Sequence, residues 1–294
     1  MDFATNSPVF PAIGPHSGGE WGMTFLVWSV AVLTSGLLLW MFSDIVWHGV
    51  RALSWDFLTQ APEDAGRAGG ISTILVSSSL IAGLCIGIAF PISLATAIYV
   101  SEFVNPDRMV GKLISTSLDT LNGVPSIVFG LFGNAFFCKT LGLGFSILAG
   151  SLTLACMVLP IMTRAILEGL RSVSQEYRLS TAALGLSRAA ALWHLLLPAA
   201  IPGIMAGLLL GVGRSFAETA ALLFTSGYSV RMPESVLDSG RTLSVHIYEL
   251  STNVSGGETN AYGSVLVAMV ALLLINVAML GIAKGWRRRA LSFG

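Results

Sequence analysis

Charge is scarce in this 294-residue sequence. Only 11% of its residues are Asp, Glu, Lys or Arg, against roughly 25% in soluble domains. Hydrophobic residues make up 54%, and long stretches carry no charge, which indicates a membrane protein rather than a soluble one. The formal net charge is zero, so the composition gives no support for nucleic-acid binding.

Cysteine and catalytic motifs are equally sparse. Cys85, Cys138 and Cys156 lie in or beside apolar segments without CxxC or Cys/His spacing, so neither a disulfide framework nor a metal site is predicted. Gly-x-Ser-x-Gly and His-Glu-x-x-His are absent, so a hydrolase would have no visible nucleophile or metal ligands. We therefore expect no catalytic residue, no metal and no enzyme activity in this chain.

A phosphate-cradling P-loop is also missing. The only Gly-Lys pair, Gly111-Lys112, is followed by Leu113, and Pro106 occupies the position of the first glycine of the motif. If ATP drives this protein, ATP and Mg²⁺ must be bound by a partner ATPase. No cofactor is expected on this chain.

Six apolar segments are long enough to cross a bilayer about 30 Å thick, at roughly 20 residues each. They lie near 22–46, 72–100, 113–134, 145–167, 199–226 and 262–283. The third contains Asn122-Gly123-Val124-Pro125, which predicts either a helix kink or a functional discontinuity. The predicted fold class is an all-α polytopic membrane protein with six transmembrane helices.

The predicted organisation has three parts. Residues 1–65 comprise an N-terminal tail, the first span and an outer loop; residues 1–21 contain no Lys or Arg, so this span is expected to stay as an anchor rather than act as a signal peptide. Residues 66–286 form a core of five spans with a cytoplasmic loop at 168–198. Residues 287–294 form a basic C-terminal tail. The outer loops near 47–70 and 227–261 are candidate contacts for an extracytoplasmic partner.

The basic residues predict the orientation. With six spans and both termini in the cytoplasm, the inner side holds ten Lys or Arg residues and the outer side five, as the positive-inside rule requires. The inner set is Arg108, Lys112, Arg164, Arg171, Arg178, Arg188, Lys284, Arg287, Arg288 and Arg289. The outer set is Arg51, Arg67, Lys139, Arg231 and Arg241. Arg214 is left inside a span.

Residues 172–198 form the longest polar interruption between two apolar segments in the second half of the chain. Ser172 with Gln175 fits a capping box, and Gly185 is a natural left-handed stop, so the pattern predicts a helix of about three turns. This helix is too polar for lipid, and Tyr177 and its apolar neighbours make it too apolar for water. We expect it to dock on a partner.

Arg214 and Glu218 lie in the middle of the otherwise apolar fifth segment. Each costs roughly 2.5–3.5 kcal/mol to insert. At i and i+4 of a helix they share one face, so they can pair and offset part of that cost, but the sequence does not decide whether the pair forms. One interpretation is a polar face along a substrate pathway, with Arg214 offering charge and hydrogen-bond donors to an oxyanion and Glu218 neutralising it at rest. The other is a buried ion pair that only fixes packing. Arg164 is either a further pathway residue or a snorkelling residue at a helix end.

Two smaller features complete the pattern. His194 and His246 are expected to be solvated or interfacial rather than ligands. Gly83 with Gly87, and the ridge of Gly203, Gly207 and Gly211, have the spacing of close helix contacts.

The loop resembles the coupling loop of ABC importer permeases, because nine residues separate Gly185 from Leu195-x-Leu197-Pro198. In that family the loop is seated in a groove of the ATPase subunit. The family's Glu-Ala-Ala falls on Leu179-Ser180-Thr181 here, so the acidic residue is missing from its place, and Glu176 is the candidate substitute. An ordinary cytoplasmic loop with this spacing is the alternative. The resemblance implies the following coupling residues: Glu176, Tyr177, Ala183, Gly185, Leu195, Leu197 and Pro198.

Longer motifs between about Gly69 and Gly285 resemble the A-type permease (PstA) family of bacterial phosphate ABC importers. They are FPISLATAIYVSEF (90–103), LNGVPSIVFGLFG (121–133), GRSFAETAALLFTSG (213–227) and LSVHIYEL (243–250). The resemblance implies a type I importer permease in the bacterial inner membrane, paired with a C-type permease. It also implies an ATPase dimer, an extracytoplasmic phosphate-binding protein, and a role in transport for Arg214, Glu218 and Arg164.

Three other functions stay open at this point. The chain could belong to a permease for another oxyanion such as molybdate or sulfate, because positive charge alone suits any of them. It could be a membrane subunit that mainly signals phosphate supply. It could also be an ion-gradient carrier that works alone, which uptake by the isolated chain would reveal.

Overall fold

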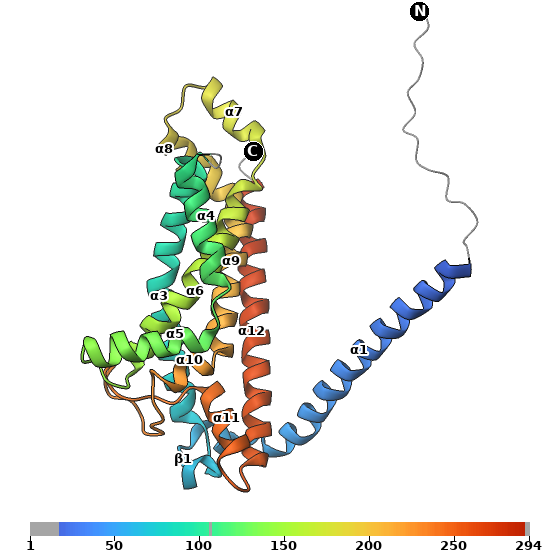
Figure 1. Cartoon of the computed structure of the whole chain (residues 1–294), viewed down its shortest axis with the longest axis vertical. Helices are drawn as coiled ribbons and strands as arrows, with labels where there is room; N and C mark the ends of the chain where they lie inside the picture. The colour runs from blue at the N-terminus through green and yellow to red at the C-terminus, as the bar shows by residue number, and fades with distance from the viewer. Residues whose placement is uncertain (1–17, 106–107, 292–294) are drawn as a thin grey trace, which may run out of the picture. The chain divides into compact units, whose positions relative to one another are not determined.

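The computed structural model describes residues 18–105 and 108–291, and most of them are helical (Figure 1). The longer helices are α1 (Gly18–Ala52), α3 (Ser72–Glu102), α6 (Ile147–Arg171), α9 (Leu197–Ala217) and α12 (Glu258–Leu291). The shorter ones are α2 (Trp55–Thr59), α4 (Met109–Asn122), α5 (Ser126–Gly133), α7 (Gln175–Ala183), α8 (Arg188–Ala191), α10 (Ala220–Leu223) and α11 (Leu243–Thr252). Wider π-helical turns at Asn134–Thr140 and Leu192–Leu196 extend α5 and join α8 to α9.

The chain divides into two compact units, residues 1–47 and 48–294. The described part of the first unit is a single stretch of α1, which contains the predicted span 22–46. Its apolar side chains are exposed all round, with Trp21, Trp28 and Trp40 each about 70% exposed. A helix that is apolar on every side has the composition of a membrane span, because water would be a poor solvent for all its faces.

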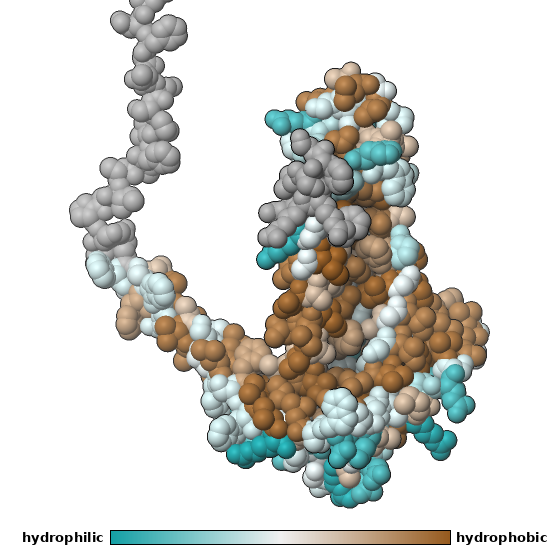
Figure 2. Space-filling view, turned by 180° about the vertical axis from the view of Figure 1, so that it is seen from behind, coloured by the Kyte–Doolittle hydropathy of each residue, from teal (hydrophilic) through white to brown (hydrophobic). Residues whose placement is uncertain are grey.

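Among the described residues, five helical segments are long and apolar enough to cross a membrane, or six if the bent pair α4–α5 counts as one span. Their order agrees with the six predicted segments. Figure 2 shows the corresponding surface of the second unit, where hydrophobic residues cover the sides of the helices and hydrophilic residues gather towards the ends. The chain is therefore a polytopic α-helical membrane protein.

The third predicted span is broken. Its two halves, Met109–Asn122 and Ser126–Thr140, meet at an angle of 93° at the Asn-Gly-Val-Pro sequence, so the break is a discontinuity and more than a kink. The second half packs on α10: Gly130 lies directly against the backbone of Ala221, and the Asn134 side-chain amide donates a 2.7 Å hydrogen bond to the Phe224 carbonyl.

Helix α6 is the centre of the second unit, with α3 and α9 packed along it. Glycines of α9 allow the close contact: Gly203 meets Gly169 of α6, and Gly207 lies against Ile166. Gly211 likewise meets Met162, so the predicted ridge of small residues is confirmed. The predicted pair Gly83 and Gly87 makes no such contact, because nothing described lies within 4 Å of a Cβ placed at either position.

A small β-hairpin interrupts the helical pattern in the loop near 47–70. Strands β1 (Pro62–Glu63) and β2 (Ala68–Gly69) pair antiparallel around a 3₁₀ turn at Asp64–Gly66. This hairpin and α11 lie at one end of the second unit, and α7 and α8 lie at the opposite end (Figure 1). The loops that the sequence assigned to opposite sides of the membrane are therefore at opposite ends of the helices.

Candidate functional site

The pair Arg214 and Glu218 stands at the end of α9 rather than in the middle of a helix. α9 stops at Ala217, and Glu218 has an extended backbone with φ −78° and ψ 128°. The predicted helix over 199–226 is therefore wrong beyond residue 217. Arg214 Nη2 still lies 3.7 Å from Glu218 Oε2, so the pair that the spacing allows is formed, across the helix end instead of along one face.

The two partners of this pair differ in their surroundings. Glu218 is buried, with its side chain 7% exposed, and its Oε1 accepts a 3.3 Å hydrogen bond from the backbone N–H of Ala221 at the start of α10. The Arg214 side chain is 48% exposed and has no hydrogen bond or other ion pair within the described residues. The carboxylate is thus fixed in place while the guanidinium keeps donors available for another group.

Backbone groups also converge on this helix end. The Ser244 hydroxyl donates a 2.6 Å hydrogen bond to the Glu218 carbonyl, which ties the break to α11. The half-span that follows the α4–α5 break packs on α10, so the two interrupted spans meet beside α9, the helix that carries Arg214. Interrupted helices at membrane depth occur where protein or a cavity surrounds the freed backbone, as in transport pathways.

Arg164 lies in α6 and reaches α4. Its Nη1 donates a 2.8 Å hydrogen bond to the Ser115 hydroxyl, and its Nη2 lies 2.9 Å from the Asp119 carboxylate. The Arg164 side chain is 31% exposed and that of Asp119 is 54% exposed. Within the described residues no hydrogen bond or ion pair joins Arg164 to Arg214, so the two predicted pathway cations belong to separate polar groups.

The loop 172–198 folds largely as its sequence predicts, with one correction. α7 covers nine residues, and Gly185 has the left-handed φ of +67°. Ser172 does not cap this helix: its hydroxyl donates to the Gly169 carbonyl at the end of α6. Ser174 takes the capping role, because its hydroxyl oxygen accepts a 3.3 Å hydrogen bond from the Glu176 N–H. α6 continues to Arg171, beyond the predicted end of the span at 167, so the capping residue is Ser174 instead of Ser172.

The same loop presents apolar side chains to its surroundings. Tyr177, Leu179 and Leu184 are 46%, 63% and 74% exposed, so these large apolar side chains stand out from a largely polar loop. An ion pair between Arg178 and Glu102 joins α7 to the end of α3. The predicted coupling residues differ in exposure: Glu176, Ala183 and Gly185 are exposed, whereas Leu195, Leu197 and Pro198 are half-buried. The exposed set is suited to a protein contact.

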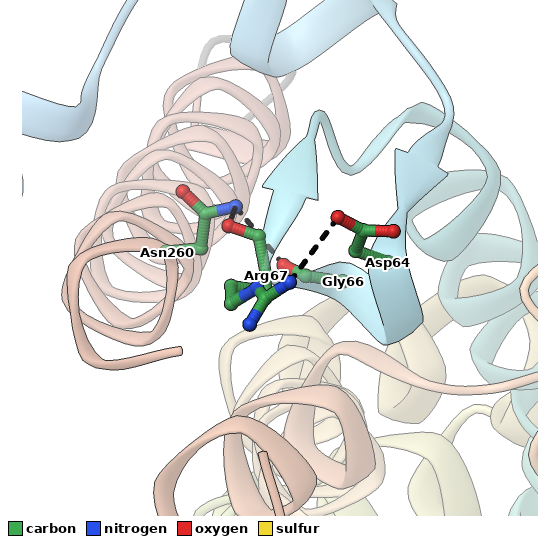
Figure 3. Close-up of polar contacts among 4 residues, drawn as sticks. All are labelled: Asp64, Gly66, Arg67 and Asn260. Carbon is green, nitrogen blue, oxygen red and sulfur yellow. Dashed lines mark hydrogen bonds and ion pairs between the residues drawn. The ribbon is translucent and has the colours of Figure 1, made fainter. Parts of the chain in front are cut away.

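The opposite end of the unit holds a compact polar group around the hairpin. The Asn260 side-chain amide of α12 donates 3.0 Å hydrogen bonds to the carbonyls of Gly66 and Arg67, and Arg67 pairs with Asp64 at 3.3 Å (Figure 3). The Asn260 hydrogen bonds join the hairpin to α12, and the ion pair lies within the hairpin.

His246 of α11 packs beside this hairpin and is fully buried, so the prediction of a solvated or interfacial histidine is wrong. Neither ring nitrogen has a hydrogen-bond partner in the part of the chain that the structure describes. Burial, together with the nearby Arg241 guanidinium, lowers the pKa of His246 from 6.5 to about 4. The neutral imidazole is therefore part of the packing. His194, by contrast, is exposed as expected.

Residues 87–291 match the family described as "Binding-protein-dependent transport system inner membrane component". This range includes the Arg214–Glu218 and Arg164–Asp119 pairs, the interrupted spans and the loop 172–198. The chain belongs to this family of transport permeases. It is thus a multi-pass inner-membrane component of a transport system, and the family is a family of permease subunits rather than enzymes.

Individual relatives of this permease are similar over most of its length. A "Probable ABC transporter permease protein YqgI" from Bacillus subtilis is 33% identical and aligns with 84% of this chain and 89% of its own. A "Phosphate transport system permease protein PstA 1" from Mycobacterium tuberculosis is 32% identical, over 86% of this chain and 83% of its own.

Solved structures agree on the fold. A chain of a bacterial ABC transporter involved in the import of the acidic polysaccharide alginate superposes with a TM-score of 0.61, covering 90% of this chain and 98% of its own at 13% identity. A chain of the MetNI methionine ABC transporter, in an inward-facing form, gives 0.55 over 74% and 94% at 14% identity. The permease therefore has the type I ABC importer fold, as the sequence predicted.

Two polar partners in this permease were not found from the sequence. Asp119 is near the Asn-Gly-Val-Pro break, and Glu102 is the last residue of α3, two positions beyond the second predicted segment. Each pairs with an arginine at least 45 residues away. A carboxylate in an apolar segment is a usable signal for a buried or paired charge. Its partner depends on which helices pack together, which a single sequence does not specify.

Proposed function

We propose that this permease forms half of the membrane pathway of an ATP-driven phosphate importer. The observation that carries the proposal is the half-exposed Arg214 guanidinium at the break in the fifth span, in a chain that aligns over most of its length with phosphate permeases. A guanidinium facing hydrocarbon would be costly, so it is expected to face water or a partner subunit within the pathway.

The geometry around Arg214 suits a transient anion. Its carboxylate partner is 3.7 Å away and is held in place by the α10 backbone, so an arriving oxyanion can replace a weak contact rather than break a tight one. Glu218 would then limit how tightly the anion binds, which favours release. Arg164 is proposed as a second pathway cation. Asp119 is its carboxylate partner, as Glu218 is the partner of Arg214.

Partners follow from the same proposal. An extracytoplasmic phosphate-binding protein would deliver phosphate at the hairpin end, and a C-type permease would complete the pathway. An ATPase dimer, which would bind ATP and Mg²⁺, would contact the exposed residues of α7 and the following turn. Both termini of this chain would lie in the cytoplasm, and the loop 168–198 with them.

The decisive experiment is ATP-dependent phosphate uptake into vesicles that contain the full complex. Wild type is compared with Arg214→Gln and Glu218→Gln, with assembly and ATPase association measured in parallel. Arg214→Gln is expected to abolish uptake in an assembled complex, because the amide keeps donors but loses the charge. Glu218→Gln is expected to retain phosphate binding and slow release.

Controls separate this function from its alternatives. Lys139→Gln removes an exposed cation that lies outside the loops near 47–70 and 227–261, and it should leave uptake unchanged. Sulfate and molybdate at the same concentration should compete poorly if phosphate is the substrate. Unaltered uptake by Arg214→Gln would reduce the pair to a packing role and refute the pathway assignment.

A further inference from the structure

Two neighbouring cavities lie where α3, α4 and α6 approach α7. The first has a volume of about 310 Å³ and lies between the end of α3, α4 and the end of α6. The second, of about 550 Å³, lies between the end of α3 and the start of α7. Arg171, the last residue of α6, lines both, so they are adjacent. Their sizes fall within the range of roughly 300–1,000 Å³ typical of small-molecule sites.

Basic and hydroxyl side chains line this pair of cavities. Lys112 and Arg171 lie on the first, together with the hydroxyls of Ser115 and Thr116. Arg171 and Arg178 lie on the second, together with Ser101 and Gln175. No Asp or Glu lines either cavity among residues 18–105 and 108–291.

Two of these cations are without a counter-charge. Lys112 and Arg171 are exposed and take part in no ion pair within the described residues. Arg178 differs, because Glu102 neutralises it at the edge of the second cavity. The first cavity therefore offers two uncompensated positive charges and two hydroxyl groups facing one space.

We propose that these cavities form an oxyanion site centred on Arg171 and Lys112, which binds a phosphate group. Arg171 would hold the group through its fork of N–H donors, Lys112 would add a point charge, and Ser115 or Thr116 would donate from the side. Basic pockets between membrane helices near the bilayer surface are suited to anionic lipid head groups, and free phosphate has the same chemistry.

This site differs from the polar group at Arg214. It is formed by α3, α4, α6 and the start of α7, and includes neither α9 nor α10. It lies next to Arg164, which donates to the same Ser115 that lines the first cavity. The proposal concerns binding alone and holds whichever substrate the transporter carries.

The test is the thermal unfolding midpoint of the full complex, purified in neutral detergent. The complex is titrated separately with dioctanoyl phosphatidylglycerol, dioctanoyl phosphatidylcholine and inorganic phosphate. We expect phosphatidylglycerol, phosphate or both to raise the midpoint, because a ligand that binds only the folded state stabilises it. Phosphatidylcholine should not do so, since its head group carries no net charge.

Variants connect the effect to the site. Arg171→Gln and Lys112→Gln should each weaken the apparent affinity about tenfold or more, the loss typical of one charged hydrogen bond. Arg171→Lys should retain part of it. Arg188→Gln is the matched control, because Arg188 is exposed, belongs to the adjoining loop and lines neither cavity. Phosphate titrations are repeated with Arg214→Gln, so that binding in the proposed pathway is not counted.

The titrations also identify the source of the group. A response to phosphatidylglycerol alone assigns the site to lipid, and a response to phosphate that persists in Arg214→Gln assigns it to the free anion. The proposal is overturned if neither titrant acts on the wild type, if phosphatidylcholine acts equally, or if Arg188→Gln weakens binding as much as Arg171→Gln.

Discussion

Arg164 and Asp119 face each other between α6 and α4, and their contact gives a specific expectation for each residue. A 2.9 Å ion pair keeps the guanidinium occupied when no anion is present. If Arg164 belongs to the pathway, Asp119 competes with the substrate for it. If the pair only holds α4 on α6, removal of either partner has the same consequence.

Asp119→Asn is therefore expected to preserve phosphate uptake and to lower its KM, because it frees Arg164 for the anion. Arg164→Gln is expected to reduce uptake more than about tenfold, the loss of a charged hydrogen bond. Uptake kinetics in vesicles measure both. Equal losses from the two single variants, with no further loss in the double variant, would show that the pair is structural.

His246 predicts how the stability of the complex depends on pH. Its folded-state pKa of about 4 lies below the unfolded value near 6.5, so between these values the unfolded chain binds more protons. Stability contributed by the neutral ring is complete above pH 6.5 and is lost as the pH falls towards 4.

Lowering the pH from 7 to 5 should cost the wild type about 2 kcal/mol through this residue, at 1.36 kcal/mol per pKa unit. His246→Gln cannot titrate, so its thermal midpoint should fall less over the same interval. The comparison is made within each protein, since the variant starts from a different stability. Parallel pH profiles for the two proteins would remove His246 as the cause.

At the scale of elements, the contact between α6 and α9 depends on glycine. A Cβ at Gly203 would collide with the backbone of Gly169, whereas nothing described lies within 4 Å of a Cβ at Gly213 in the same helix. Because backbone atoms of Gly203 and Gly169 meet directly, no flexible side chain can move away to make room for the added Cβ. The two helices would have to separate along their length.

Gly203→Ala should lower the stability of the assembled complex by about 1–3 kcal/mol, the usual cost of overpacking. Gly213→Ala is the matched control and should be neutral or slightly stabilising, because alanine is the better helix former. Thermal unfolding in detergent or nanodiscs gives both values. Similar midpoints for the two variants would argue that the helices adjust without loss.

For the whole molecule, α7 and the hairpin lie at opposite ends of the helices, so we expect them on opposite sides of the membrane. With Cys85, Cys138 and Cys156 replaced by alanine, Leu184→Cys reports on the α7 end and Arg231→Cys on the loop after α10. Membrane-impermeant maleimide should label Arg231→Cys in intact cells and Leu184→Cys only in inverted vesicles. The reverse pattern would place the termini outside and reject the basic-residue assignment.

Much of this permease follows from the sequence. The apolar segments predicted the order of the spans, since removing some 20 residues from water is a local property of composition. Asn122-Gly123-Val124-Pro125 predicted the break, and Gly185 the end of α7, because backbone restrictions are equally local. The spacing of Arg214 and Glu218 allowed an ion pair, but whether the pair forms was decided by the structure, in which α9 ends between the two residues.

The tertiary structure decided which distant groups meet. Arg164 with Asp119, Arg178 with Glu102 and the buried position of His246 depend on helices that are far apart in the chain. The cavities around Arg171 have the same origin, because α3, α4, α6 and the start of α7 must come together to form them. Composition determines that a segment enters the membrane, but pairing between segments depends on side-chain packing in three dimensions, which no local pattern contains.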